Sequence, residues 1–307
     1  MTPHEIPLER RTLHGHFSQG LEPVLTVEPG DTIAFSCLDS GWNAQPGSKY
    51  EPRDPELDAG HALVGPVEVR GARAGQTLEI SIDRVVPGAW GWCGAGNWSS
   101  PLNERLGLTE DGVYLRWDLD PSARVGRDER GREVDLRPFL GVLGMPPPEP
   151  GLHSTTPPRA WGGNIDCKEL VEGTRLYLPI PLDGALFSAG DCHARQGDGE
   201  VSQLAIECPL ERAELTLGLS ELELRTPIAW TPEGWLTFGF DEDLDEAAAI
   251  AIDAMLELVG RDHGLERADA LALASLVVDV RVTQVVNAVQ GIHAVLPHDA
   301  LRFTRIG

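Results

Sequence analysis

The sequence predicts a mainly β protein: an antiparallel sandwich or barrel-like core with a C-terminal portion that contains two helices, α+β overall. In the first 240 residues, short apolar runs alternate with turns, and the 34 glycines and 24 prolines are spread along the chain. A helical period of apolar residues begins only after that point. We therefore expect one domain over 1–307, with a helical segment, 241–307, packed on a β-rich part, 1–240.

The first half of the chain contains repeated strand-turn-strand patterns. We expect strands at 23–27 and 32–37 around the turn Glu28-Pro29-Gly30-Asp31, and again at 65–69 and 75–82. The short turns favour a hairpin for each pair. The polar segment 43–60 predicts a loop, and weaker strand patterns at 111–120 and 133–136 precede a buried apolar run at 137–148.

The second half changes from strands to helices. Strands are expected at 175–180, 185–188, 201–207, 213–217, 222–226 and 235–240. A helix is expected at 243–260, capped by Asp243 and ended by Gly260, because its apolar residues recur at steps of three and four. A second helix is expected at 268–279, then a strand or helix extension at 280–287 and a last strand at 291–296.

Charge and cysteine content exclude several classes of partner. The 25 basic and 48 acidic residues give a net charge of −23, which repels nucleic acid and anionic membranes, so we expect neither as a partner. The five cysteines are odd in number and form no CxxC pair. Residues 1–11 lack an apolar signal region, and no apolar run approaches the ~18 residues that span a bilayer. We expect a cytoplasmic protein with reduced thiols.

A stretch between two expected strands is rich in proton carriers and metal ligands. We interpret 190–200 as a loop, in which Gly190, Gly197 and Gly199 allow positive φ angles and close approach to a ligand. It carries Asp191, His193, Gln196, Asp198 and Glu200. Asp191 and His193 are two residues apart, so both can face one ion. Asp198 lies between two glycines, and we expect it to be a turn residue.

Two further groups are candidates for a site. His14 and His16 alternate with a glycine and point the same way in an extended chain, as a metal or proton-transfer pair or as two surface imidazoles. Trp90, Trp92 and Trp98 lie in a glycine-rich setting, where they wall a pocket or close the end of the sandwich. The sequence leaves both alternatives open.

Several motifs in order along the chain resemble the acetamidase/formamidase family. The central ones are GGNID at 162–166, LYLP at 176–179, GALFS at 184–188, GDCH at 190–193 and QGDGE at 196–200. The resemblance extends to HGH at 14–16, EPGD at 28–31, GPV at 65–67, PP at 157–158 and the block 275–297. It implies a β-rich core with C-terminal helices, a homo-oligomer (a dimer or a multiple of it), and hydrolysis of small linear amides to ammonia and a carboxylate.

The chain departs from that family's pattern at two positions, which carry Arg195 and Gln203 where smaller residues are expected. The position of Cys192 varies in the family. A cation at Arg195, beside the expected site, puts the choice of substrate in question but leaves the class of reaction unchanged.

Amide hydrolysis needs a nucleophile, stabilisation of the oxyanion and an acid for the leaving nitrogen. A divalent metal supplies the first two, with zinc favoured by a mixed nitrogen and oxygen ligand set and calcium or magnesium second. The candidate metal ligands are Asp191, His193, His16, Asp39 and Glu207. We expect Glu200, as general base or acid, Asp166 and His193 to be catalytic, and Asn164, Gln196 and Trp92 to bind the substrate.

Two alternatives stay open. Cys192 is the one cysteine beside a histidine and is a candidate nucleophile, although its nearest lysine, Lys168, lies outside the usual context of thiol amidases. A non-catalytic protein could hold a metal or a small solute in the same loop. Ammonia release from formamide or acetamide separates catalysis from binding.

Overall fold

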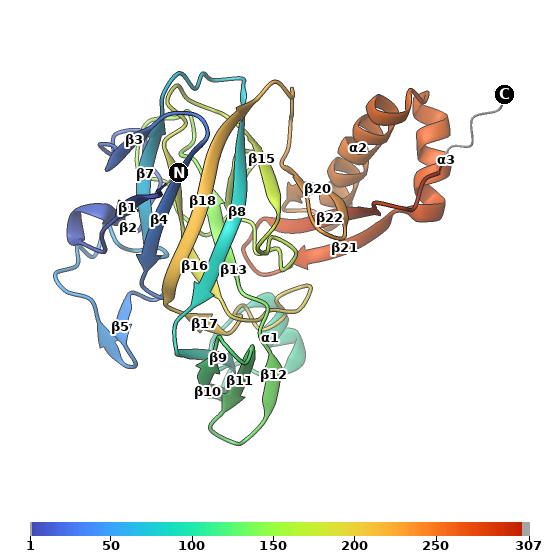
Figure 1. Cartoon of the computed structure of the whole chain (residues 1–307). Helices are drawn as coiled ribbons and strands as arrows, with labels where there is room; N and C mark the ends of the chain where they lie inside the picture. Colours follow the sequence, from blue (N-terminus) through green and yellow to red (C-terminus); the bar gives the residue numbers. More distant parts are fainter. Residues whose placement is uncertain (1, 303–307) are drawn as a thin grey trace.

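The computed structural model describes residues 2–302, which form two large β-sheets that face each other (Figure 1). Apolar side chains of both sheets share one core, for example Ile80 and Leu215 of the first sheet and Leu140 and Phe187 of the second. Alternation of buried and exposed residues along the strands directs these side chains inward. The predicted mainly β, α+β fold is confirmed.

The first sheet has nine strands, antiparallel except for the parallel pair at one edge, where β1 runs beside β4. Across the sheet the order is β1 (His4–Ile6), β4 (Asp31–Cys37), β18 (Leu210–Ser220), β8 (Thr77–Pro87), β15 (Arg175–Pro179), β19 (Ile228–Trp230), β20 (Gly234–Asp241), β22 (Gln290–Pro297) and β21 (Asp279–Gln284).

The second sheet has eleven strands and one branch. Its main path is β12 (Glu133–Asp135), β11 (Val125–Asp128), β10 (Gly112–Asp120), β9 (Trp90–Gly96), β17 (Glu207–Cys208), β16 (Phe187–His193), β13 (Phe139–Gly144) and β14 (Gly162–Asn164). The branch is β7 (Leu63–Val69), which pairs with β16 and also with β2 (Leu13–His14) and β3 (Leu25–Val27). A small separate hairpin joins β5 (Asn43–Gln45) and β6 (Ser48–Lys49) within the expected loop 43–60.

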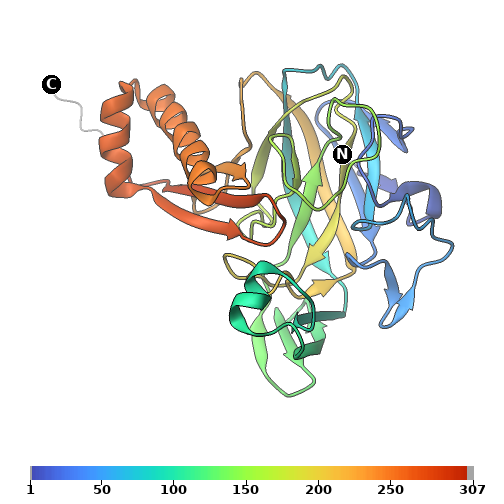
Figure 2. The same cartoon turned by 180° about the vertical axis from the view of Figure 1, so that it is seen from behind.

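Two helices, α2 (Leu244–His263) and α3 (Arg267–Val277), cover the far half of the first sheet, over β20, β22 and β21 (Figures 1 and 2). Their apolar residues form a second core with these strands. The side chain of Asp243 accepts hydrogen bonds from two backbone N–H groups of the first turn, as predicted for the cap. The helix ends one turn later than predicted, because Gly264, with φ 65°, and not Gly260, takes the left-handed conformation that stops it.

The predicted hairpins are wrong. β3 lies in the second sheet and β4 in the first, and β7 and β8 are divided in the same way. The chain between them crosses from one sheet to the other. Turn chemistry explains the reversal of direction, but the choice of strand partner depends on packing between segments far apart in sequence.

Other local differences follow from irregular backbone near the centre of the chain. The segment predicted as a strand at 201–207 is mostly irregular, with a turn at its start, and only its last residue belongs to β17. The predicted strand 222–226 is a loop whose Leu222 and Leu224 pack on the second core. The strand β9 and the short helix α1 (Pro101–Leu106) were not predicted; with β10–β12 they form a lobe at one end of the sandwich (Figure 2).

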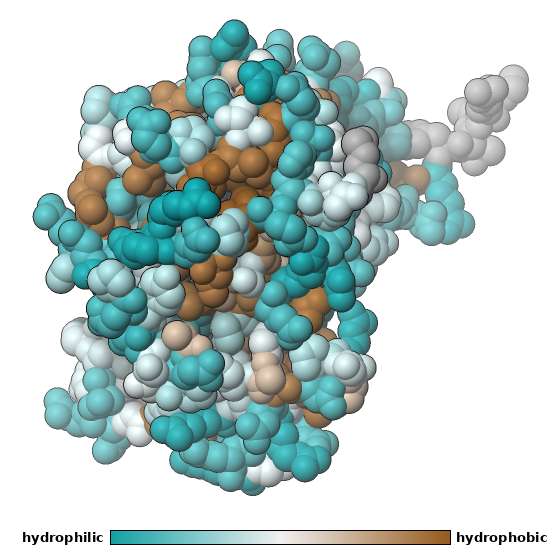
Figure 3. All heavy atoms as spheres, turned by 60° about the vertical axis from the view of Figure 1, so that its left-hand side comes forward, coloured by the Kyte–Doolittle hydropathy of each residue, from teal (hydrophilic) through white to brown (hydrophobic). Residues whose placement is uncertain are grey.

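The net charge of −23 lies mainly at the surface, since only eight of the 48 acidic residues are buried. Figure 3 shows hydrophilic side chains over much of one face, with apolar side chains gathered across its middle and upper part. Within residues 2–302, none of the helices combines the length and the apolar character needed to cross a membrane. Four of the eight buried acidic residues gather at one place in the second sheet.

That place is set by strand β16. Along one edge, β16 pairs with β13 over most of its length. Along the other edge its partner changes, from β7, which pairs up to Gly190, to β17, which begins at Cys192. Asp191 stands at the change of partner. The segment 190–193, predicted as a loop, is therefore part of a strand. What changes at Asp191 is the neighbouring strand, which is β7 before this residue and β17 after it.

Candidate active site

Four buried carboxyl groups surround one imidazole at the end of β16. The five side chains are between 1% and 6% exposed, and they come from the loop after β14, from β16, from the loop that follows it, and from β17. They are Asp166, Asp191, His193, Glu200 and Glu207. All five were predicted from sequence to be catalytic or metal-binding residues, and the structure brings them together.

The ring of His193 is held in one orientation. Its Nδ1 lies 2.8 Å from Oε1 of Gln196, whose Nε2 donates to the backbone carbonyl of Asp166 at 2.7 Å. Because an amide oxygen only accepts, Nδ1 carries the hydrogen and donates it. The other nitrogen, Nε2, then faces Oδ1 of Asp191 at 3.3 Å and Oε1 of Glu207 at 3.4 Å. Gln196, predicted to bind substrate, is thus placed to position His193.

The backbone is strained at three of the four carboxyl residues. Asp166, Asp191 and Glu200 have φ angles of 53°, 58° and 45°, in the left-handed region that side chains other than glycine rarely adopt. Each such residue costs on the order of 1–3 kcal/mol, less for aspartate, and persists where the surrounding structure enforces it. Of the three glycines expected to provide positive φ here, Gly199 does so, with φ 89°. Gly190 instead allows close approach of the carbonyl oxygen of Ala62.

Gly141 of β13 leaves the space in which the cluster sits. A Cβ atom at this position would lie 2.5 Å from Oδ2 of Asp191, 2.7 Å from Oδ1 of Asp166 and 2.9 Å from Cε1 of His193. Those distances are shorter than real contacts, so any larger residue displaces the cluster. The sequence signal was a glycine inside an apolar strand, which often marks a close approach of this kind.

Burial and the charges of neighbouring groups give the four carboxyl groups different pKa values. Burial raises the pKa of Asp166 to about 7 and that of Glu207 to about 7, although His193 acts against it in both cases. Burial and the neighbouring Asp166 raise the pKa of Glu200 well above its usual value. Asp191 is the exception: burial opposes its ionisation, but His193 and the more distant His61 outweigh burial and lower its pKa.

The cluster has the donor set for a divalent cation. Among the described residues, seven buried side-chain atoms have no hydrogen-bond partner, and four of them are oxygens at this site, from Asn164, Asp166, Asp191 and Glu207. Unpaired buried acceptors are unfavourable unless something else satisfies them. Zinc bonds of about 2.0–2.2 Å in tetrahedral geometry place nitrogen and oxygen ligands about 3.3–3.5 Å apart. The distances from His193 Nε2 to Asp191 and Glu207 match that spacing.

Two predicted ligands lie outside this cluster. Nδ1 of His16 bonds the carbonyl oxygen of Leu57 at 2.7 Å, and none of the ligand groups among the described residues includes His16. Asp39 is fully buried but already accepts three hydrogen bonds, two from Asn43 and one from Nε1 of Trp92 at 2.8 Å. Asp39 is therefore occupied by other partners, whereas the bond at Nδ1 of His16 involves only one of its two ring nitrogens.

The predicted substrate-binding residues border the cluster. Asn164, on β14, is buried, with its Oδ1 unpaired. Trp92 of β9 stands opposite Glu207 of β17 and stacks on Tyr114, with ring centroids 5.5 Å apart. Trp98, which follows β9, donates to Gln203, in the turn that follows Glu200.

The remaining sequence candidates lie away from the cluster or have other contacts. Arg195 is exposed, and its guanidinium donates to the backbone of Asp135, so it brings no cation to the cluster. Asp198 is also exposed and forms an ion pair with Lys168. Cys192 belongs to the hydrophobic core, on the strand face opposite Asp191 and His193.

Two residues near the cluster were not predicted. Asn287, in the connection between β21 and β22, donates from Nδ2 to Oδ2 of Asp166 at 2.7 Å. His61, in the segment before β7, is held through Nδ1 by Thr155 at 2.8 Å and acts electrostatically on Asp191. No local pattern marks either residue, because only the tertiary fold brings them to the site.

A cavity of about 470 Å³ lies beside the cluster, between α1 and the β21–β22 connection. Its walls are largely apolar and include Leu102, Val285 and Val286, together with Gln203. None of the four carboxyl groups lines it. The cavity therefore adjoins the cluster and does not include it.

Comparisons with known proteins agree with this architecture. The chain matches the sequence model of the Acetamidase/Formamidase family over residues 4–153 and 150–217. The acetamidase of Mycolicibacterium smegmatis is 25% identical over 62% of this chain, and the formamidase of Methylophilus methylotrophus 27% identical over 62%. The matched regions span 61% and 60% of those two relatives, which is less than two thirds of their length.

Structural similarity extends further along the chain. A crystal structure of an acetamidase from Bacillus halodurans superposes with a TM-score of 0.84 at 27% sequence identity. The superposition covers 95% of this chain and 97% of that one, including the C-terminal helices beyond the matched family region. The resemblance inferred from the central motifs is confirmed: the chain belongs to the acetamidase/formamidase family of amidases.

Proposed function

We propose that this protein hydrolyses small linear amides to ammonia and a carboxylate at the cluster around His193, with the help of a divalent metal ion, zinc by preference. The observation that carries the proposal is the Nε2 atom of His193, which lies within 3.4 Å of one oxygen of Asp191 and one of Glu207, while each of these carboxyl groups has a buried oxygen without a hydrogen-bond partner. The named activities of the related acetamidase and formamidase support the reaction.

His193, Asp191 and Glu207 are the residues best placed to hold the ion. Gln196 holds one hydrogen of His193 on Nδ1, so Nε2 is the nitrogen that would bind an ion, after losing its own hydrogen. The low pKa of Asp191 keeps it ionised, as a ligand must be. A bound ion would polarise the amide carbonyl and lower the pKa of a water molecule.

Glu200 and Asp166 are placed to move the proton that the leaving nitrogen needs. Burial, and after it the charge of Asp166, raise the pKa of Glu200 well above its usual value, which favours its protonated form. Asn287 holds one oxygen of Asp166. When two neighbouring carboxyl groups differ in pKa, the one that holds its proton more tightly suits the acid role and the other suits the base role. Glu200 would donate to the amide nitrogen and recover a proton from water.

The burial of the cluster favours small substrates. With side chains at most 6% exposed, the reacting atoms have little room around them. Each methylene group that does not fit costs about 1–3 kcal/mol in discrimination. Formamide, acetamide and propionamide are the amides that fit this constraint.

The first test is ammonia release across a series of amides at neutral pH. We expect formamide, acetamide or propionamide to react faster than any long-chain or aromatic amide. Glu200→Gln preserves shape but not proton transfer and should lower kcat by about 10²–10⁴-fold with a smaller effect on KM. A preference for bulky amides, or full activity in the Gln variant, contradicts the assignment.

The second test removes the metal. Dialysis against a chelator should abolish ammonia release, and added zinc should restore it. Asp191→Asn keeps the side-chain shape and tolerates the left-handed backbone, but it is a much weaker ligand. This variant should fold and show little activity at any zinc concentration that restores the wild-type protein. Activity that survives complete metal removal would sink the metal-assisted form of the proposal.

The third test concerns the space at Gly141. Gly141→Ala should lower activity by 10²-fold or more, since a shift of about 1 Å in reacting groups has effects of that size. Gly197→Ala is the matched control, because a Cβ atom there meets nothing within 4 Å and the residue lies in the loop of the same site. Equal activity of the two variants would show that the cluster tolerates the displacement.

The fourth test separates the thiol mechanism from the metal one. Cys192 packs in the core, so Cys192→Ala should keep most of the activity and lose some stability. A loss of several orders of magnitude in a folded Cys192→Ala protein would favour the cysteine as nucleophile.

A further inference from the structure

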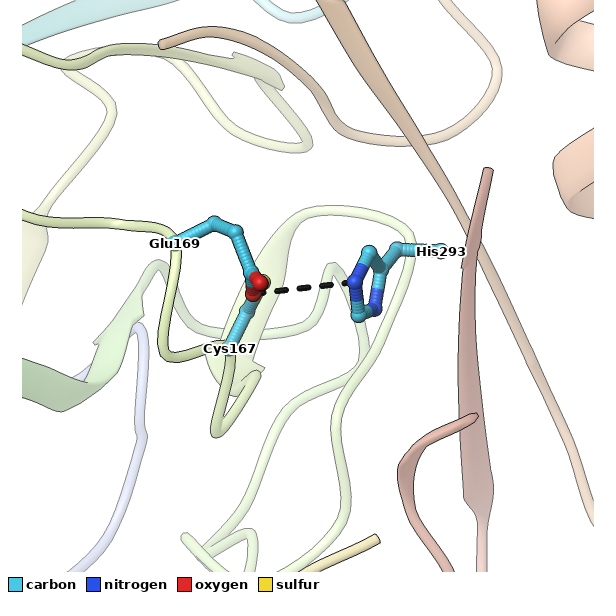
Figure 4. Close-up of side chains that lie close together, drawn as sticks. All are labelled: Cys167, Glu169 and His293. Atoms are coloured by element: carbon cyan, nitrogen blue, oxygen red, sulfur yellow. Dashed lines mark hydrogen bonds and ion pairs between the residues drawn. The ribbon is translucent and has the colours of Figure 1, made fainter. Parts of the chain in front are cut away.

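We propose that Cys167, Glu169 and His293 form a second, structural metal site that suits zinc. The three side chains lie between the loop after β14 and strand β22, and Figure 4 shows His293 facing the Glu169 carboxylate, with Cys167 on the same loop as Glu169. The site shares no residue with the His193 cluster, and the inference does not rest on the proposed amidase activity.

The spacing of the three ligand atoms fits a tetrahedral zinc site. Sγ of Cys167 lies 3.3 Å from Oε2 of Glu169, which lies 3.6 Å from Nε2 of His293, and all three atoms are within 4.8 Å of one another. Zinc bonds of about 2.3 Å to sulfur and about 2.0–2.2 Å to nitrogen and oxygen place nitrogen and oxygen about 3.3–3.6 Å apart and sulfur about 3.6 Å from either, which is within about 0.3 Å of the two distances observed. The three residues are at most 2% exposed, and they would supply three of the four ligands of a tetrahedral zinc ion.

His293 supplies the second observation. Its Nε2 is fully buried and has no hydrogen-bond partner, although the ring is completely enclosed. Its Nδ1 bonds Oγ1 of Thr283, on the neighbouring strand β21, at 2.8 Å. This bond fixes the ring with Nε2 directed at Glu169, in the way that outer partners orient metal-binding histidines. A hydrogen bond from the Cys167 thiol to Glu169 would leave Nε2 unsatisfied, whereas a metal ion satisfies all three groups.

The two oxygens of Glu169 face different surroundings. Oε2 faces Cys167 and His293, while Oε1 lies 3.5 Å from Arg281 Nη1 and 4.0 Å from Lys168 Nζ. These cations orient the carboxylate from outside the ligand set.

The charges around the site balance when zinc is bound. Lys168 also pairs with Asp198 at 2.8 Å, and Arg281 with Asp279 at 3.4 Å, so both cations have further anionic partners. A thiolate, a carboxylate and a neutral imidazole together neutralise one divalent ion. The dry interior then holds no excess charge.

Such a site would join two parts of the chain that also meet at the His193 cluster. Cys167 follows directly after Asp166, and His293 lies six residues after Asn287, which holds Asp166. A metal ion would tie these two segments together. Its role is therefore to hold the segments in place, with no contact to the substrate.

Zinc-edge X-ray absorption of the full chain, produced in zinc-supplemented cells, tests the site in the wild-type protein. We expect a sulfur neighbour at about 2.3 Å, because none of the residues proposed for the His193 site is a cysteine. Cys167→Ser and His293→Gln should each lose about one equivalent of zinc per chain and the sulfur signal. Cys192→Ser is the matched control and should keep both. Asp191→Asn should also keep the sulfur signal, which separates this site from the first.

Zinc without a sulfur neighbour in the wild-type protein would overturn the proposal, even if the variants failed to fold. So would a protein without bound zinc, or a sulfur signal that survives in Cys167→Ser or disappears in Cys192→Ser.

Discussion

Carboxylates that are buried within a few ångströms of one another repel strongly, and this repulsion governs the centre of the second sheet. Asp166, Asp191, Glu200 and Glu207 share one imidazole, so a single positive charge cannot neutralise them. Either protons or a cation must supply the rest. Protons reduce the repulsion when Asp166, Glu200 and Glu207, whose pKa values are raised, are protonated and Asp191, whose pKa is low, stays ionised. A bound divalent ion would reduce the repulsion instead, and the carboxyl oxygens without hydrogen-bond partners favour this arrangement.

The fold holds this unfavourable arrangement by distributing it over many elements. The loop after β14, the strands β16 and β17, and the loop between those strands each contribute one or two of the five side chains. The change of partner along β16 and the left-handed backbone of three residues are local defects that the surrounding sandwich tolerates. Gly141 on β13 and Asn287 beyond β21 complete the enclosure from opposite parts of the chain. The apolar core that the two sheets share offsets the free-energy cost of these features.

The sequence indicated the fold class and the members of the cluster, but not the arrangement that joins them. Turn residues such as Gly30 and helix signals such as Asp243 act within a few residues and were interpreted correctly. The hairpins were predicted wrongly, because the partner of β3 is β7, a strand almost forty residues further along the chain. Gly141, His61 and Asn287 were missed for the same reason. Each matters through contacts made only in the folded protein, whereas Asp191, His193 and Glu200 stood close together in one motif.

The most direct measurement is an anomalous difference map from crystals of the purified protein, with data collected on either side of the zinc absorption edge. The account predicts a zinc peak within bonding distance of His193 Nε2 and of carboxylate oxygens of Asp191 and Glu207. A map with no metal peak at this position, and with the carboxyl groups hydrogen-bonded directly to one another and to His193, would contradict it.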